Sequence, residues 1–161
     1  AADRHDVVAM PELILMRHAA AHAAAIGAGD FERPLSAAGR KQARQSALRL
    51  AAVTTGVERV LFSPAQRSSE TAQIVASELS LSPQALLAVP ALYAATPAAI
   101  RAAIAREHGG ARVLLVVGHN PGISELGGEL AGAGSHAQLP TAGFWHGTLD
   151  APAWQALIHG S

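Results

Sequence analysis

Six side chains able to bind or attack an anion lie within five residues of the ends of short apolar runs. They are two arginines, two histidines, a serine and an asparagine: Arg17, His18, Ser63, Arg67, His119 and Asn120. Guanidinium groups offer paired donors to phosphoryl oxygens, and imidazolium adds a positive donor. A neutral histidine is also a nucleophile. Gathered in one place, these residues would suit a phosphate dianion and its transfer.

Their convergence depends on three apolar runs, at residues 13–16, 60–62 and 113–117. Each run is short, unbroken and rich in branched side chains, which is typical of a strand buried on both faces of a parallel sheet. In such sheets ligands lie beyond the carboxyl ends of the strands. We therefore expect the six side chains to meet at one edge of the sheet.

Helix signals alternate with these runs. Ser36 is a cap residue, Ser63 and Pro64 place a cap before a proline, and further helices are expected to begin near Pro97 and Pro121. A weaker strand is expected at residues 86–89, and the tail predicts two more strands, at 144–149 and 154–158, joined by a turn. The alternation predicts an α/β fold, a three-layer α/β/α sandwich with a mostly parallel central sheet.

The chain has 161 residues, half of them hydrophobic, with 12 Lys and Arg against 12 Asp and Glu and no cysteine. We expect a flexible N-terminal tail at residues 1–10 and a single domain at 11–161. A balanced charge argues against nucleic-acid and membrane-surface partners, and no apolar run approaches the roughly 20 residues of a membrane span. The lack of cysteine excludes disulfides and thiolate chemistry, and predicts a cytoplasmic protein.

Residues 15–19 (LMRHA), 63–72 (SPAQRSSETA) and 118–121 (GHNP) resemble, in order, the motifs of the histidine phosphatase superfamily. The resemblance spans roughly residues 13–130. The short chain and the segment 33–40 (RPLSAAGR) look like the short bacterial branch of that superfamily, the SixA-type phosphohistidine phosphatases. The resemblance implies a phosphoglycerate-mutase-like fold.

The resemblance also implies a two-step phosphoryl transfer. Neutral His18 would attack phosphorus in line, and water would then hydrolyse phospho-His18. Arg17, Arg67 and His119 would hold the phosphoryl oxygens through the transition state. Ser63 and Asn120 are expected beside the substrate.

Relatives that cleave alkyl phosphates place a carboxylate after the second histidine or after the strand before the third helix. This chain has Asn120 at the first place and residues 89–92 (VPAL) at the second. An alkoxide leaving group needs a proton donor, whereas the imidazole of a phosphohistidine leaves more easily. We therefore expect a phosphohistidine substrate, such as a phosphohistidine-containing signalling protein, although Glu32 or Glu125 could fold into the site as an acid.

Two alternatives remain open at this stage. One is a small-molecule phosphomonoesterase, or less readily a mutase, of the same superfamily. The other is a phosphate- or phosphoprotein-binding module without turnover, for which a nucleophilic histidine would be unnecessary. No metal or other cofactor is predicted, because His18 and His22 follow a strand and no third ligand has a suitable spacing.

Overall fold

The computed structural model describes residues 9–132 and 138–160. Within them, five strands form one sheet in the order β3-β2-β4-β1-β5. The strands are β1 (Glu12–Arg17), β2 (Arg59–Phe62), β3 (Leu86–Ala88), β4 (Val113–Gly118) and β5 (Phe144–Thr148). The first four are parallel, and β5 runs antiparallel to β1 at the sheet edge. The predicted mostly parallel sheet is confirmed, and all three apolar runs are strands.

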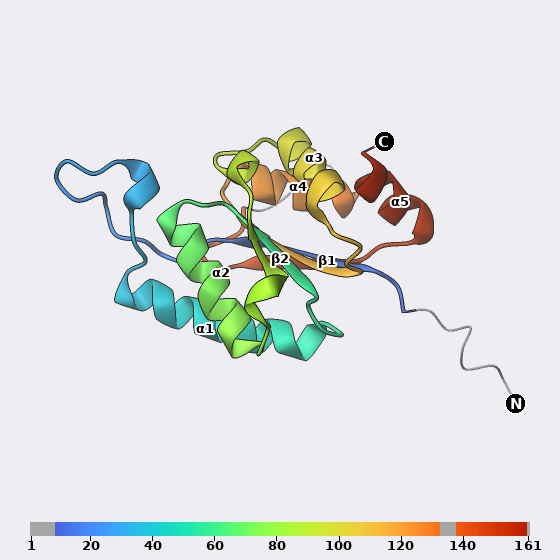
Figure 1. The fold of residues 1–161 in the computed structure, drawn as a ribbon, viewed down its shortest axis with the longest axis horizontal. Coiled ribbons are helices and arrows are strands. Elements are labelled where there is room, and N and C mark those ends of the chain that lie inside the picture. Colours follow the sequence, from blue (N-terminus) through green and yellow to red (C-terminus); the bar gives the residue numbers. More distant parts are fainter. Residues whose placement is uncertain (1–8, 133–137, 161) are drawn as a thin grey trace, which may run out of the picture.

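Helices cover both faces of this sheet. They are α1 (Ala37–Val53), α2 (Gln66–Glu78), α3 (Pro97–Glu107), α4 (Gly122–Leu130) and α5 (Ala151–His159), with short 3-10 helices η2 (Asp30–Glu32), η3 (Pro83–Ala85) and η4 (Pro90–Leu92). Figure 1 shows α1 and α2 on one face and α3, α4 and α5 on the other. The predicted α/β/α sandwich is therefore confirmed.

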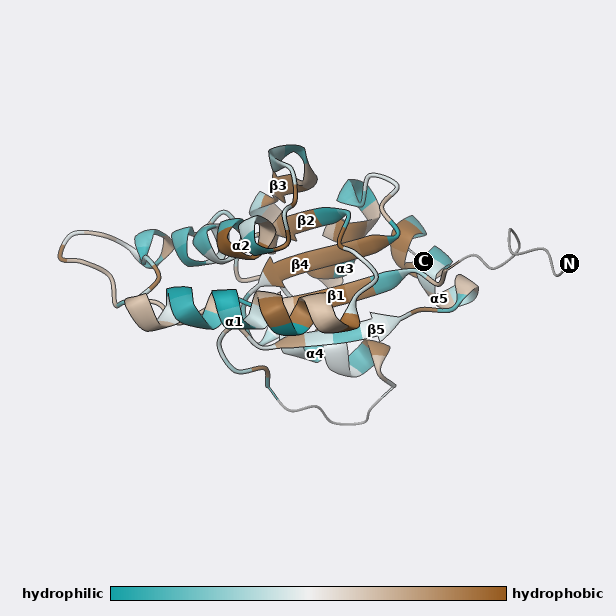
Figure 2. Cartoon of the chain, turned by 90° about the horizontal axis from the view of Figure 1, so that it is seen from below, coloured by the Kyte–Doolittle hydropathy of each residue, from teal (hydrophilic) through white to brown (hydrophobic). Residues whose placement is uncertain are grey.

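The core is split by the alternation of side chains along each strand. Leu13 and Leu15 of β1 pack with α3, α4 and α5, whereas Ile14 and Met16 pack with α1 and α2. All four side chains are fully buried. Strands β1, β2 and β4 are accordingly hydrophobic along most of their length (Figure 2). A strand buried on both faces shows no alternation in its sequence, which is why the apolar runs were unbroken.

Helix starts follow the capping chemistry with one difference. The Ser36 hydroxyl accepts a hydrogen bond from the backbone N–H of Gly39, as expected of an N-cap. In α2, however, the helix begins at Gln66 with Ala65 as its N-cap, so Ser63 and Pro64 precede it. Ser63 therefore does not act as the N-cap of α2, and its hydroxyl accepts a hydrogen bond from the backbone N–H of Ala65.

The expected strand at residues 154–158 is wrong, because this segment belongs to helix α5. The Asp150 carboxylate accepts from the N–H of Ala153 and caps the helix, with Pro152 in its first turn. Trp154 and Leu157, three residues apart, pack into the core beneath α3. Residues 150–152 thus begin a helix, whereas their sequence predicted a turn between two strands.

The segment between β1 and α1 leaves the body of the molecule as a projecting loop (Figure 1). A bridge between Ala21 and Leu35 closes its base, and η2 lies at the end of its return path. Residues 1–8 of the predicted tail lie outside the described residues, and the single-domain assignment stays a prediction. Among the described helices, none is long and apolar enough to cross a membrane.

Candidate active site

The parallel order of β1, β4 and β2 brings three strand ends together. Arg17 pairs with Gly118 across β1 and β4, and Phe62 pairs with Val117 across β2 and β4. The residues that follow, His18, Ser63 and His119, therefore emerge side by side at one sheet edge. This edge is where the sequence predicted an anion site.

His18 is held in one orientation by its own backbone. The ring Nδ1 lies 2.8 Å from the carbonyl oxygen of Ala19, which can only accept, so Nδ1 carries the proton. The lone pair is then on Nε2, which accepts from Nε of Arg67 at 3.3 Å. The side chain is buried, and its unprotonated nitrogen faces the arginine. This is the tautomer that a nucleophilic histidine requires.

Arg67, in the first turn of α2, lies at the centre of the cluster. Its Nη2 lies 3.4 Å from Nδ1 of His119, while Nε contacts His18. The rings of His18 and His119 are 5.3 Å apart between centroids. The Nε and Nη2 edge of this one guanidinium therefore contacts both histidines, and such an edge can donate to two oxygens of one phosphoryl group.

Ser63 contacts the ring of His119 on the side away from Arg67. Its hydroxyl lies 2.8 Å from Nε2 of His119, which leaves Nδ1 toward Arg67 and the cluster. A hydroxyl can donate or accept, so Ser63 can accompany either neutral tautomer or the imidazolium. Ser63 is fully buried, and its hydroxyl contacts the ring of His119. Its predicted direct contact with substrate stays a prediction.

Arg17, the last residue of β1, keeps one donor unused. Its Nη1 donates to the carbonyl of Leu139 at 3.2 Å, whereas Nε is buried and has no partner among the described residues. A buried N–H without an acceptor costs about 1–3 kcal/mol. An anion bound in this cluster would supply the missing acceptor.

Burial and local charge lower the pKa of both histidines. Burial lowers the pKa of His18 from its ordinary 6.5 to about 4, against the Ala19 hydrogen bond, with the charges of Arg67 and Arg17 adding to the fall. Burial and the same arginines lower the pKa of His119 to about 4. Without ligand, both rings are neutral at pH 7.

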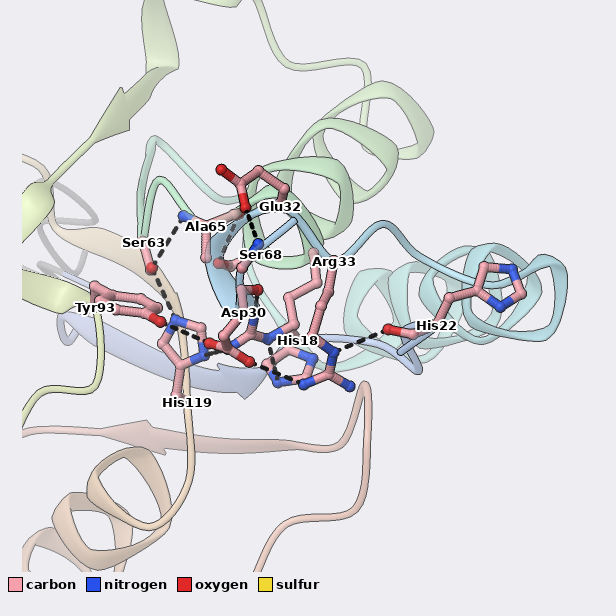
Figure 3. A network of polar contacts seen from close by, with 12 residues as sticks. His18, His22, Asp30, Glu32, Arg33, Ser63, Ala65, Ser68, Tyr93 and His119 are labelled. Atoms are coloured by element: carbon pink, nitrogen blue, oxygen red, sulfur yellow. Dashed lines mark hydrogen bonds and ion pairs between the residues drawn. The ribbon is translucent and has the colours of Figure 1, made fainter. Parts of the chain in front are cut away.

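A carboxylate that the sequence did not point to lies in the same cluster. Asp30 Oδ2 contacts Nη2 of Arg67 at 2.9 Å and accepts from the hydroxyl of Tyr93 at 2.6 Å (Figure 3). The Tyr93 ring in turn packs edge-on against His119, with 5.5 Å between centroids. Asp30 comes from η2 and Tyr93 from the end of η4, and neither directly follows one of the three apolar runs that predicted the site. Only their three-dimensional placement reveals them.

The remaining predicted residues have other partners. The Asn120 side chain donates to the carbonyl of Leu139 and accepts from Ser124, so it ties α4 to the segment before β5. Its contact with substrate stays a prediction. Glu32, considered as a remote acid, accepts from the N–H of Gly29 on the exposed loop. Among residues 9–132 and 138–160, no three His, Asp or Glu side chains are grouped as metal ligands would be.

Comparison with known proteins agrees with this geometry. The family model "histidine phosphatase superfamily (branch 1)" matches residues 13–88. The protein histidine phosphatase SixA in complex with tungstate is 29% identical, with a TM-score of 0.76 over 88% of this chain and 90% of that one. A protein assigned as the phosphohistidine phosphatase SixA of Nakamurella multipartitia is also 29% identical, with a TM-score of 0.74 over 96% and 92%. Residues 13–88 of this chain thus match the histidine phosphatase superfamily, and nearly the whole chain has the fold of SixA proteins.

More distant structures share the fold alone. A mycobacterial glucosyl-3-phosphoglycerate phosphatase is 16% identical, with a TM-score of 0.59 over 86% of this chain and 90% of that one. No curated protein sequence matches the chain. The superfamily match includes Arg17, His18 and Arg67 and ends before β4. His119 lies outside the matched residues and joins the cluster from the residue after β4, the strand between β1 and β2.

Proposed function

We propose that this chain is a phosphatase that forms a phosphohistidine intermediate on His18 and removes phosphate from phosphohistidine. The observation that carries the proposal is the state of His18. Its Nδ1 is bonded to the Ala19 carbonyl, and its Nε2 lone pair faces the guanidinium of Arg67. A neutral nitrogen beside a fixed cation suits in-line attack on phosphorus.

The surrounding donors support phosphoryl transfer over binding alone. In the proposed reaction the Nε2–P bond forms as the bond from phosphorus to the leaving nitrogen breaks, and the leaving imidazole, protonated on its other ring nitrogen, departs as a neutral ring. Arg17, Arg67 and His119 hold the equatorial oxygens, and water then releases inorganic phosphate from His18. Donors fixed in this way are commonly worth about 10²–10³ in rate each. A module that only bound phosphate would have no use for an oriented nucleophile.

The acid–base groups of the site favour a phosphoramidate substrate. Hydrogen bonds from Tyr93 and Arg33, with Arg67, hold the pKa of Asp30 far below its usual range, so this carboxyl has no proton to donate. The same contact raises the pKa of Tyr93, which makes its hydroxyl a weaker acid. A leaving imidazole needs less assistance than an alkoxide. We infer that the donor is a phosphohistidine-containing signalling protein, and cytoplasmic action remains part of the proposal.

Turnover of matched substrates tests the leaving-group assignment. We expect kcat/KM for phosphohistidine to exceed that for glycerol phosphate by about 100-fold or more, the range that a general acid would otherwise supply. Equal or faster hydrolysis of the alkyl ester would instead favour the small-molecule phosphomonoesterase.

Trapping the intermediate tests the mechanism separately. Quenched enzyme should carry acid-labile, alkali-stable phosphate, and His18→Ala should lose both this label and at least about 10³ of the rate. His22→Ala, which removes an exposed histidine four residues away, is the control and should keep both. Tight phosphate binding without any label would favour the binding module.

A further inference from the structure

The anion position beside Arg67 is partly taken by the protein's own carboxylate. Besides the two histidines, the guanidinium contacts two groups of one residue: the Asp30 carboxylate at Nη2, 2.9 Å away, and the Asp30 backbone carbonyl at Nη1, 2.8 Å away. In the view of Figure 3, the Asp30 side chain lies between the rings of His18 and His119. The same Nη2 is directed at His119, so carboxylate and phosphoryl oxygen would compete for it.

The carboxylate is held there by groups that recognise negative charge. Oδ2 accepts from the Tyr93 hydroxyl at 2.6 Å, and Oδ1 accepts from Arg33 at 3.1 Å. Together with Arg67, these donors surround Asp30 much as they would surround two oxygens of a bound phosphate. The contact therefore has the chemistry of a ligand in a binding site.

The two partners differ in their freedom to move. The Arg67 side chain is 7% exposed, whereas that of Asp30 is 49% exposed. Asp30 belongs to the three-residue helix η2, which contains no buried residue. Rotation of the carboxylate into solvent would leave Arg67 bonded to the Asp30 carbonyl. The anion position can therefore open without a change in the core.

We propose that Asp30 is an internal competitor for the phosphoryl position: a substrate displaces its carboxylate from Arg67, and its return after hydrolysis helps to expel inorganic phosphate. The idea rests on the proposed function of this cluster as a phosphoryl site. Tyr93 is a positioning residue that keeps the carboxylate over the cluster. A pocket occupied by the competitor for nine-tenths of the time binds about tenfold more weakly than an open one.

Equilibrium binding of inorganic phosphate to the full chain, measured by calorimetry, tests the proposal without turnover. We expect Asp30→Asn to bind phosphate about 5- to 10-fold more tightly, and the inhibition constant of phosphate as product to fall by the same factor. Tyr93→Phe removes no charge but frees the carboxylate, and should tighten binding about 2-fold. If Asp30 merely positions Arg67, Asp30→Asn will weaken binding instead, and the proposal is wrong.

Glu32→Gln is the matched control for charge. It removes one negative charge from the same short helix, where the Glu32 side chain bonds only to Gly29 among the described residues, so it should change phosphate binding less than 2-fold. Equal tightening in Glu32→Gln and Asp30→Asn would show a general field effect and overturn the competition. This binding test does not depend on which substrate the enzyme hydrolyses. Tighter phosphate binding by Asp30→Asn would support the competition even if phosphohistidine is not a substrate. Unchanged binding would refute the competition even if phosphohistidine is a substrate.

Discussion

At the scale of single residues, the site depends on which nitrogen of each histidine carries its proton. His18 and His119 face the cluster through different atoms, Nε2 in the first and Nδ1 in the second. Each outer nitrogen is bonded to the protein, in one case to the Ala19 carbonyl and in the other to the Ser63 hydroxyl. A carbonyl fixes one tautomer, whereas a hydroxyl permits either. The arrangement suits a fixed nucleophile beside an adaptable oxygen donor.

The lowered pKa of His18 makes a prediction about pH. Because burial favours the neutral ring, His18 should stay unprotonated as pH falls through 6.5 and become protonated only near pH 4. NMR titration of labelled histidine in the ligand-free enzyme measures this directly, and formation of phospho-His18 should decline over the same range. Arg67→Gln should move the titration upward, since a neighbouring cation is removed. A midpoint near 6.5 in the unmodified protein would contradict the buried, neutral nucleophile.

Residues after apolar runs could be predicted, and residues delivered by loops could not. Arg17 ends β1, and His18 and His119 directly follow β1 and β4, so the parallel sheet alone brings them to one edge. Asp30 reaches the cluster by the return path of a projecting loop, and Tyr93 by the turn after β3. Their contact joins positions 63 residues apart, and neither position belongs to one of the three motifs.

At the scale of elements, α1 and α2 hold the segment that follows β1. The N–H of Ala19 donates to Thr71 of α2, and the N–H of Ala20 donates to Gln42 of α1. The Ala20 carbonyl accepts from Ser36 at the start of α1. These contacts fix the Ala19 carbonyl that orients His18. The two helices therefore position the nucleophile as well as covering the sheet.

Gly39 makes this close contact possible. A Cβ at position 39 would lie 1.9 Å from the Ala20 carbonyl oxygen, so Gly39→Ala must push the two backbones apart. We expect a loss of about 1–3 kcal/mol in the free energy of unfolding, as for other overpacked sites, measured by denaturant titration. The rate of His18 phosphorylation should also fall, because the Ala19 carbonyl would move.

Gly127→Ala is the control for Gly39→Ala, since it is also a helical glycine. A Cβ there would meet Trp145 at an ordinary 3.5 Å. It should therefore be neutral, or more stable by up to about 1 kcal/mol through helix propensity. Equal effects of the two substitutions would refute the role assigned to the contact between Gly39 and Ala20.

Helices and strands could be predicted from the sequence where a local signal, such as a cap residue or an unbroken apolar run, matched the burial of the segment in the fold. The apolar runs of β1, β2 and β4 and the cap at Ser36 needed no long-range information. Helix α5 was misassigned because residues 154–158 (WQALI) form too short an apolar stretch for its period to be read. Its helical state depends on the Asp150 cap and on the packing of Trp154 under α3.

At the scale of the whole molecule, the formal charge is balanced at 12 against 12, yet the site gathers two arginines and two histidines. Neutral histidines limit the repulsion within this cluster, and Asp30 offsets part of the remaining charge. Protonation of the two histidines at low pH would add positive charge to this cluster. The free energy of unfolding of the whole fold should therefore depend on the protonation state of the two histidines.

The final prediction concerns this link between pH and stability. In the unfolded chain His18 and His119 bind protons near pH 6.5, but in the fold only near pH 4. The unfolded state therefore binds more protons between these values, and the free energy of unfolding should fall as pH decreases from 6.5 to 4, by up to about 3 kcal/mol for each histidine. Denaturant titrations at several pH values measure the slope. His119→Gln, compared with the unmodified protein at pH 8 as baseline, should remove about half of it. An unchanged slope would mean that His119 is not held neutral by the fold.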